Sequence, residues 1–291
     1  MSLLVGSLSG QNWHRQMRRL NLDQTQRLDY MIAKTAAVAK EFGFSPMSID
    51  LSASALPSLD RSYVDELKAR LAQNGLTPVI YVGGVVLSYD DEVRLGALDT
   101  GYKHLEVAAQ LGIHTVGFGC GMNGRVTREG RIKLAIDSVG RLGKVARDHD
   151  IRICQEDWDF FTSDDLIRIC EGTGLDNVGI QSDTGNWYIL GEDPLFATKK
   201  CLPLTFHTHV RDYVIEGGTY NGVALGRGIV DFPNILPLFA QRAKNTRLVL
   251  SMEVDTDDRD EDKEAHESYR YLKEWLVGTG HWPEVSSGID S

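Results

Sequence analysis

Residues 150–183 read DIRICQEDWDFFTSDDLIRICEGTGLDNVGIQSD and carry the pattern from which the fold can be inferred. A strand pattern covers 150–158 and ends in charged residues. A helical segment over 163–172 follows and stops at the glycines of EGTG. A second strand pattern then covers 177–183. A strand, a helix and a strand in this order are typical of a parallel sheet.

The same alternation extends along the chain in both directions. Strand patterns start near residues 3, 47, 77, 113, 151, 177, 203 and 247. Helical patterns cover residues 24–43, 60–74, 92–111, 131–149, 163–172, 191–201, 231–244 and 260–276. Eight such units predict an α/β fold, a single (β/α)8 TIM barrel forming one domain over 1–291. A doubly wound open sheet is the alternative, but SGQNW at 9–13 lacks the glycines of a phosphate loop.

The composition is that of a globular protein with an excess of acidic residues. Hydrophobic residues make up 42% of the chain, and 31 Lys and Arg against 41 Asp and Glu give a net charge of −10. Nucleic acids and anionic membranes attract basic surfaces, so we expect neither as a partner. The start lacks a signal-peptide pattern, and no apolar run approaches the ~20 residues that span a bilayer. We expect a cytoplasmic protein whose four scattered cysteines are reduced.

Four strand patterns in the second half of the chain end on a side chain that can bind a metal ion. These residues are Glu156, Asp183, His209 and Glu253. In TIM barrels the active site lies at the carboxyl ends of the strands. The first three follow one another at about the length of one β/α unit. The longer interval before the fourth is explained by an expected extended loop over 213–228.

Strand alternation indicates that these four side chains share the inner face of the barrel, because residues two positions apart lie on one face. The residues in phase with them are small or polar, namely Cys154, Gly179, Gln181, Thr205, His207 and Ser251. The opposite face is apolar in all four strands. A single strand-terminal carboxylate is equally well explained as a helix cap or a salt-bridge partner. Four in phase predict a shared site at the barrel mouth.

Three carboxylates and one imidazole around a hollow suit one divalent metal ion, with positions left for water or substrate. We expect Mn²⁺ first, with Mg²⁺, Co²⁺ and Zn²⁺ as alternatives. Without a metal ion the carboxylates would repel one another and raise their pKa values.

The motifs around these residues resemble a known family. They are ICQED at 153–157, GIQSDTGN at 179–186, HTHVRD at 207–212, GRGIVDFP at 226–233 and LSMEVD at 250–255. The chain resembles the xylose isomerase-like superfamily, in particular the sugar phosphate isomerase/epimerase group that includes D-tagatose 3-epimerase and the inosose dehydratases. The resemblance implies that Glu156, Asp183, His209 and Glu253 bind one divalent metal. It also implies that the two glutamates flank the substrate and move protons.

Further residues are predicted to bind substrate. The family commonly has a histidine where this chain has Asn186, which can hydrogen-bond but cannot act as a base near neutral pH. An epimerase arginine beyond the metal-binding histidine is missing, and Arg211 could replace it or form a salt bridge with Asp212 or a helix. Trp158 and Trp187 follow metal-bearing strands and could stack on a sugar, with core packing as the alternative. His207 is expected to form a hydrogen bond with a metal-binding side chain rather than to bind the metal itself.

These features predict a metal-dependent isomerase or epimerase of a sugar, keto-sugar or polyol. The metal would lower the free energy needed to form an enediolate, and Glu156 and Glu253 would act as acid and base. A lyase or dehydratase that expels a β-leaving group from the same enediolate is the alternative. An apurinic-site endonuclease and a non-catalytic sugar-binding barrel are weaker alternatives. The expected partner is a small carbohydrate, and the sequence leaves a homo-oligomer open.

Overall fold

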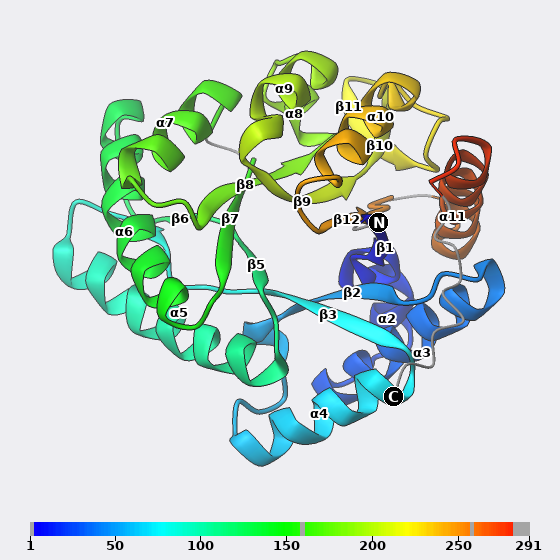
Figure 1. The fold of residues 1–291 in the computed structure, drawn as a ribbon, viewed down its shortest axis with the longest axis horizontal. Helices are drawn as coiled ribbons and strands as arrows, with labels where there is room; N and C mark the ends of the chain where they lie inside the picture. Colours follow the sequence, from blue (N-terminus) through cyan, green and yellow to red (C-terminus); the bar gives the residue numbers. More distant parts are fainter. Residues whose placement is uncertain (1–2, 158–160, 257–258, 282–291) are drawn as a thin grey trace.

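The computed structural model describes residues 3–157, 161–256 and 259–281. Eight parallel strands close into a barrel in the order β1-β12-β9-β8-β7-β5-β3-β2 (Figure 1). Their bounds are Leu3–Ser7 (β1), Met47–Ser52 (β2), Leu76–Tyr81 (β3), Thr115–Phe118 (β5), Arg152–Glu156 (β7), Val178–Asp183 (β8), Thr205–Val210 (β9) and Leu248–Met252 (β12). This architecture confirms the predicted (β/α)8 fold, with a strand at each of the eight expected places.

Helices surround the barrel (Figure 1). The main ones are Gln24–Phe42 (α3), Arg61–Gln73 (α4), Asp91–Leu111 (α5), Arg128–Asp148 (α6), Ser163–Thr173 (α7), Pro194–Cys201 (α9), Phe232–Arg242 (α10) and Glu261–Gly278 (α11). Short helices cover Ser9–Asn12 (α1), His14–Arg19 (α2) and Asn186–Ile189 (α8). None of the helices among the described residues could cross a bilayer by its length and apolar character.

Local sequence signals set the ends of the helices. Asp23 and Thr162 precede α3 and α7 and form capping boxes. In each box the capping side chain accepts the backbone N–H of the third helical residue, whose side chain accepts the backbone N–H of the capping residue. Gly43 and Gly174 end the same two helices in the left-handed region, which glycine enters without a steric penalty. These signals explain why the expected helix boundaries agree closely with the structure.

The core lies between the barrel and its helices. The outward side chains of the strands, such as Ile153, Ile180 and Leu250, are fully buried against them. Asn12 in α1 ties the seam where the first and last strands pair. Its Nδ2 donates to the Met252 carbonyl at 3.0 Å, and its Oδ1 accepts from the Val254 amide at 2.7 Å. Because the apolar side chains of the strands pack outward against the helices, their polar side chains lie inside the barrel.

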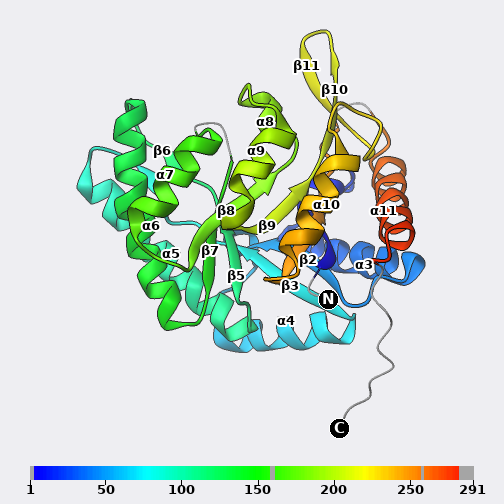
Figure 2. The same cartoon turned by 45° about the horizontal axis from the view of Figure 1, so that its top comes forward.

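Two small sheets lie outside the barrel. Val86–Leu87 (β4) pairs in parallel with Gly121–Met122 (β6). Asp212–Glu216 (β10) pairs antiparallel with Thr219–Val223 (β11), and this hairpin projects from the molecule (Figure 2). The expectation of an extended loop over 213–228 is therefore wrong for residues 213–223, which form this hairpin.

Asp212 ties the hairpin to the segment that follows it. Its Oδ2 accepts backbone N–H groups from Gly226 and Gly228 at 2.9 and 2.8 Å. Its Oδ1 accepts those of Val230 and Tyr213, both at 3.0 Å. One buried carboxylate thus satisfies four backbone donors, three of which lie outside helices and strands.

Asp212→Asn should lower the free energy of unfolding by about 2–4 kcal/mol, because the new NH2 group cannot accept hydrogen bonds and leaves the two backbone N–H donors that it faces unsatisfied. Urea unfolding followed by circular dichroism measures the change. Asp231→Asn is the matched control, since Asp231 is exposed and makes no side-chain bond to the helix backbone it precedes. A loss no larger than that of the control would contradict the assigned role of Asp212.

Candidate metal centre

The four expected metal ligands meet at the carboxyl end of the barrel. Glu156 ends β7, Asp183 ends β8, His209 lies in β9 and Glu253 directly follows β12. These strands are consecutive around the barrel wall. One ligand atom of each side chain lies within 4.8 Å of the ligand atoms of the other three. The structure thus brings these residues into one cluster, which we call the metal centre.

His209 lies between the carboxylates of the metal centre. Its Nδ1 is 3.0 Å from Glu156 Oε1, 3.1 Å from Glu253 Oε2 and 3.8 Å from Asp183 Oδ2. The side chains of His209, Asp183 and Glu253 are buried, whereas 13% of the Glu156 side chain is exposed. Glu156 is therefore the one of the three carboxylates that is most open to a molecule in the barrel mouth.

Arg211 is a buried cation beside the metal centre. Its Nη2 donates to Asp183, and its Nη1 lies 2.8 Å from Glu253 Oε1. Asn186 Oδ1 accepts a further hydrogen bond from Nη2 at 3.1 Å. Arg211 does not adopt the alternative salt bridge to Asp212, whose carboxylate oxygens accept backbone amides instead. The guanidinium therefore compensates two of the buried carboxylates.

Burial and neighbouring charges act in opposition on the titratable groups of the metal centre. Burial alone would raise the pKa of Asp183, but the charge of Arg211 and the hydrogen bond from His209 hold it well below its usual range. Burial raises the pKa of Glu253, against the charge of Arg211. Burial would lower the pKa of His209, but the charge of Glu156 raises it well above its usual value. In the metal-free protein, Arg211 and His209 thus balance the negative charge of these carboxylates.

The donor set fits one divalent cation. Carboxylate oxygens with one imidazole nitrogen are ligands that Mn²⁺ and Mg²⁺ accept. Among the described residues, the buried Glu253 Oε2 contacts His209 Nδ1 as an ion pair at 3.1 Å and accepts no further hydrogen bond, so this oxygen becomes available to a cation that replaces the His209 proton. A cation would also take the place of the proton on His209, because metal ligands bind in their deprotonated form.

A cavity of about 600 Å³ opens onto the metal centre. Glu156, His209, Arg211 and Glu253 line one part of it. The remaining wall includes His14, Met31, Leu51, Ser52, Tyr81 and Cys120. Its volume is in the range of small-molecule sites, and its wall combines apolar side chains with a few converging polar ones.

Two of the expected substrate-binding residues, Trp187 and Asn186, are buried. Trp187 is fully buried and its Nε1 donates to Ser182 Oγ at 3.2 Å, so it packs as a core residue, at odds with stacking on a sugar. Asn186 is also buried, and its backbone N–H donates to Asp183 Oδ1 at 3.3 Å. It therefore contacts Asp183 and Arg211 but is not among the residues that line the cavity described above. Trp158 lies outside the described residues.

Sequence reasoning missed three residues beside the metal centre. Asp50 in β2 lies 2.9 Å from His207 Nε2, and Tyr81 in β3 places its hydroxyl 3.2 Å from His209 Nε2. Asp157 Oδ1 accepts the backbone N–H of Asp183 at 3.0 Å. Burial raises the pKa of Asp157 well above its usual value, with the charge of Asp183 acting in the same direction.

A sequence signal for Asp50 existed. It alternates with Ser48 and Ser52 on one face of β2, which is the same pattern of polar residues that marked the later strands. Tyr81 and Asp157 gave no comparable signal, because an aromatic residue at a strand end and a second acidic residue after Glu156 are both common at surfaces.

A model of the xylose isomerase-like TIM barrel family matches residues 36–275, and the chain belongs to that family. D-psicose 3-epimerase from Clostridium cellulolyticum H10, solved with D-tagatose, is 19% identical, with a TM-score of 0.71 over 95% of this chain and 99% of that one. A xylose isomerase-like TIM barrel protein from Mycobacterium smegmatis, solved with magnesium, is 20% identical, with a TM-score of 0.70 over 94% and 96%.

L-ribulose 3-epimerase is 16% identical, with a TM-score of 0.71 over 99% of both chains. At these identities the likeness to solved structures establishes a shared fold. Sequence comparison with curated proteins gives no match.

Arg211→Leu should lower the free energy of unfolding of the metal-free protein by about 3–5 kcal/mol, because it leaves the buried Asp183 and Glu253 without their counter-charge. Urea unfolding in the presence of a chelator measures this loss. Arg168→Leu is the matched control, since it breaks an exposed pair with Glu129 that contributes about 0–1 kcal/mol. Equal losses in the two variants would contradict the compensating role of Arg211.

Proposed function

We propose that the protein is a divalent-metal-dependent isomerase or epimerase that acts on a sugar, keto-sugar or polyol. The observation that carries this proposal is the placement of Glu156 and Glu253 on one cavity, 3.0 and 3.1 Å from the same nitrogen of His209. Strands β8 and β9 separate the two strands from which these glutamates come. Two carboxylates that approach a small cavity from different strands can serve as base and acid on one bound molecule.

Glu156, Asp183, His209 and Glu253 would hold the metal ion, with Mn²⁺ as the first expectation and Mg²⁺, Co²⁺ and Zn²⁺ as alternatives. When bound, such an ion supplies positive charge to a substrate carbonyl and the neighbouring hydroxyl. The related barrel from Mycobacterium smegmatis was solved with magnesium, which supports a divalent cation in this fold.

The side chains of this protein would move the proton. One of Glu156 and Glu253 takes it from a C–H bond next to the carbonyl, which yields an enediolate. The other, in its protonated acid form, would donate its own proton to the opposite face or to the neighbouring carbon, and proton exchange with water would then restore both glutamates. Arg211 lines the cavity and can donate to a substrate oxygen while it compensates Asp183.

Elimination is the second candidate reaction. The Asn186 side chain bonds to Arg211, so an amide stands where related barrels commonly carry a titratable histidine. With one proton-transfer group fewer, the enediolate can instead expel a β-leaving group, as in a lyase or dehydratase. The net charge of −10 argues against a nucleic-acid substrate.

We further propose that the chain acts as one domain on a small carbohydrate. In support of this, β1 and β12 pair side by side, so the first and last strands of the described chain complete the same barrel.

Glu156→Gln and Glu253→Gln should each lower kcat on a keto-sugar substrate by about 10²–10⁴-fold, because each removes one proton-transfer group. Keto-sugars are incubated with the protein in D₂O, and products are separated and examined for deuterium by NMR. Isomerised product that carries deuterium supports the proposal, and an unsaturated product supports elimination. Glu129→Gln, on the exposed face of α6, should leave kcat unchanged. Full activity in both site variants would contradict the assignment.

Protein purified without a metal-binding tag should contain about one equivalent of a divalent metal, because the four candidate ligands form one cluster. Glu253→Gln should lower this occupancy, since it replaces a charged ligand by a neutral one. Elemental analysis of both proteins tests the expectation. Two or three equivalents of zinc would favour a phosphodiester hydrolase instead, and no metal even after reconstitution would refute the proposed function.

A further inference from the structure

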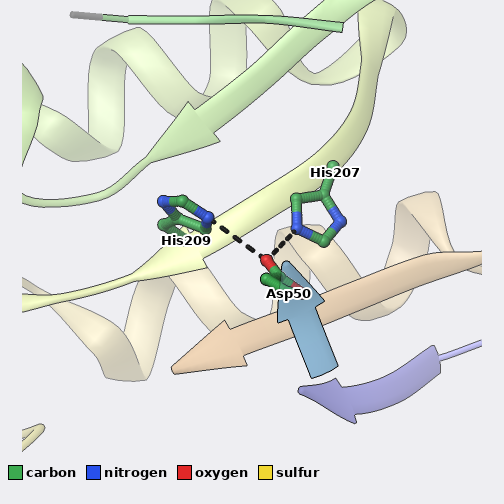
Figure 3. Close-up of side chains that lie close together, drawn as sticks. All are labelled: Asp50, His207 and His209. Atoms are coloured by element: carbon green, nitrogen blue, oxygen red, sulfur yellow. Dashed lines mark hydrogen bonds and ion pairs between the residues drawn. The ribbon is translucent and has the colours of Figure 1, made fainter. Parts of the chain in front are cut away.

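Asp50 connects two histidines inside the barrel. Its Oδ2 lies 2.9 Å from His207 Nε2 and 3.4 Å from His209 Nε2 (Figure 3). All three side chains are buried, with at most 1% exposed. Asp50 comes from β2, whereas both histidines come from β9, and β12 and β1 lie between these strands in the barrel wall. The contact therefore crosses the barrel interior.

The two ring nitrogens of His209 face different surroundings. Nδ1 faces the carboxylates of the metal centre, with Glu156 and Glu253 at 3.0 and 3.1 Å. Nε2 faces Asp50 at 3.4 Å and the hydroxyl of Tyr81 at 3.2 Å, while the Gln181 side-chain amide lies 3.5 Å from Nδ1 and 3.4 Å from Nε2 and does not distinguish the two nitrogens. A neutral imidazole carries its proton on one nitrogen and a lone pair on the other. The partner of each nitrogen thus decides whether the lone pair points at the metal centre.

We propose that Asp50, oriented by His207, is a positioning residue that keeps the proton of His209 on Nε2 and so directs the Nδ1 lone pair at the metal ion. This inference rests on the proposed metal site. An ionised carboxylate can only accept hydrogen bonds, so Asp50 requires a donor at Nε2. The hydroxyl of Tyr81 can also accept, and its contact is compatible with the same tautomer.

The competing tautomer explains why such a residue is needed. Glu156 and Glu253 are also acceptors, and they attract the His209 proton to Nδ1, where it would block a cation. Asp50 offers an acceptor on the other side of the ring. Histidines that bind metals generally donate their second N–H to a carboxylate or carbonyl, and loss of that partner weakens metal binding about 10–100-fold.

His207 orients the carboxylate in turn. Its Nε2 contacts the same oxygen of Asp50 that faces His209, while Asp50 Oδ1 has no hydrogen-bond partner among the residues that the structure describes. The rings of His207 and His209 are nearly perpendicular, with an interplanar angle of 79° and centroids 5.7 Å apart. Both rings can therefore point a nitrogen at one oxygen without stacking on each other.

Metal titration tests the inference. The full chain is stripped with a chelator and titrated calorimetrically with Mn²⁺ alone, and we expect one equivalent to bind to the unaltered protein. Asp50→Asn and Asp50→Ala should raise the Kd about 10–100-fold at unchanged stoichiometry. His207→Gln should weaken binding in the same direction. Asp165→Asn is the matched control, because this buried carboxylate bonds to Arg128 and to the backbone at the start of α7 rather than to a residue of the metal centre, and should leave the Kd unchanged.

The tautomer gives a readout that a merely structural role would not change. In the Zn²⁺-loaded protein with ¹⁵N-labelled histidine, His209 should show a bound Nδ1 and a protonated Nε2, and the Nε2 signal should shift in Asp50→Asn. Zinc on Nε2, or an unchanged Kd in folded Asp50 variants, would overturn the inference. Loss of a second metal equivalent with Asp50 would show instead that Asp50, His207 and His209 hold a cation. If the unaltered protein binds no metal, the proposed function itself fails.

Discussion

The structure depends on compensation of the carboxylates buried at the barrel mouth. Asp183 and Glu253 could not remain ionised there without a partner, because an unpaired charge in a protein interior is strongly unfavourable. Arg211 contacts both, and His209 lies within 4 Å of each. Two backbone amides, those of Gly185 and Asn186, add donors to Asp183 Oδ1. The remaining elements of the site are arranged around this balance of charge.

Strand register brings the partners to one level. Between β8 and β9 the pairing is irregular, since Ile180 is opposite Thr205 while Gln181 is opposite His207. The extra residue in β9 places Asp183 opposite His209, whereas a regular pairing would have placed Thr208 there and pointed the imidazole away from the site. A single local irregularity thus sets which side chain of β9 joins the metal centre.

Sequence pattern alone could predict the barrel and its four strand-end residues. The alternation of residues indicates which side chains point into the barrel, and the length of each β/α unit indicates how far along the barrel axis they lie. It could not predict which residues meet across the barrel. Asp50 showed the polar alternation of β2, but its contact with His207 depends on the tilt of strands that are far apart in the chain. The burial of Trp187 was equally out of reach, since a ring after a strand can turn toward the mouth or the core. The hairpin of β10 and β11 forms around Asp212, whose partners come from backbone amides that carry no sequence signature.

The two oxygens of Glu253 have separate roles, and this separation explains how a permanent cation and a metal ion can share one cluster. Oε1 contacts Arg211, whereas Oε2 forms an ion pair with His209 Nδ1 at 3.1 Å and accepts no further hydrogen bond within the described part of the chain. Arg211 therefore compensates the charge of Glu253 without covering the oxygen that a metal ion would use. A divalent ion needs to replace only the proton on His209, and Arg211 remains in place. The cluster is thus compensated in both states, so the fold does not have to rearrange when the metal ion binds.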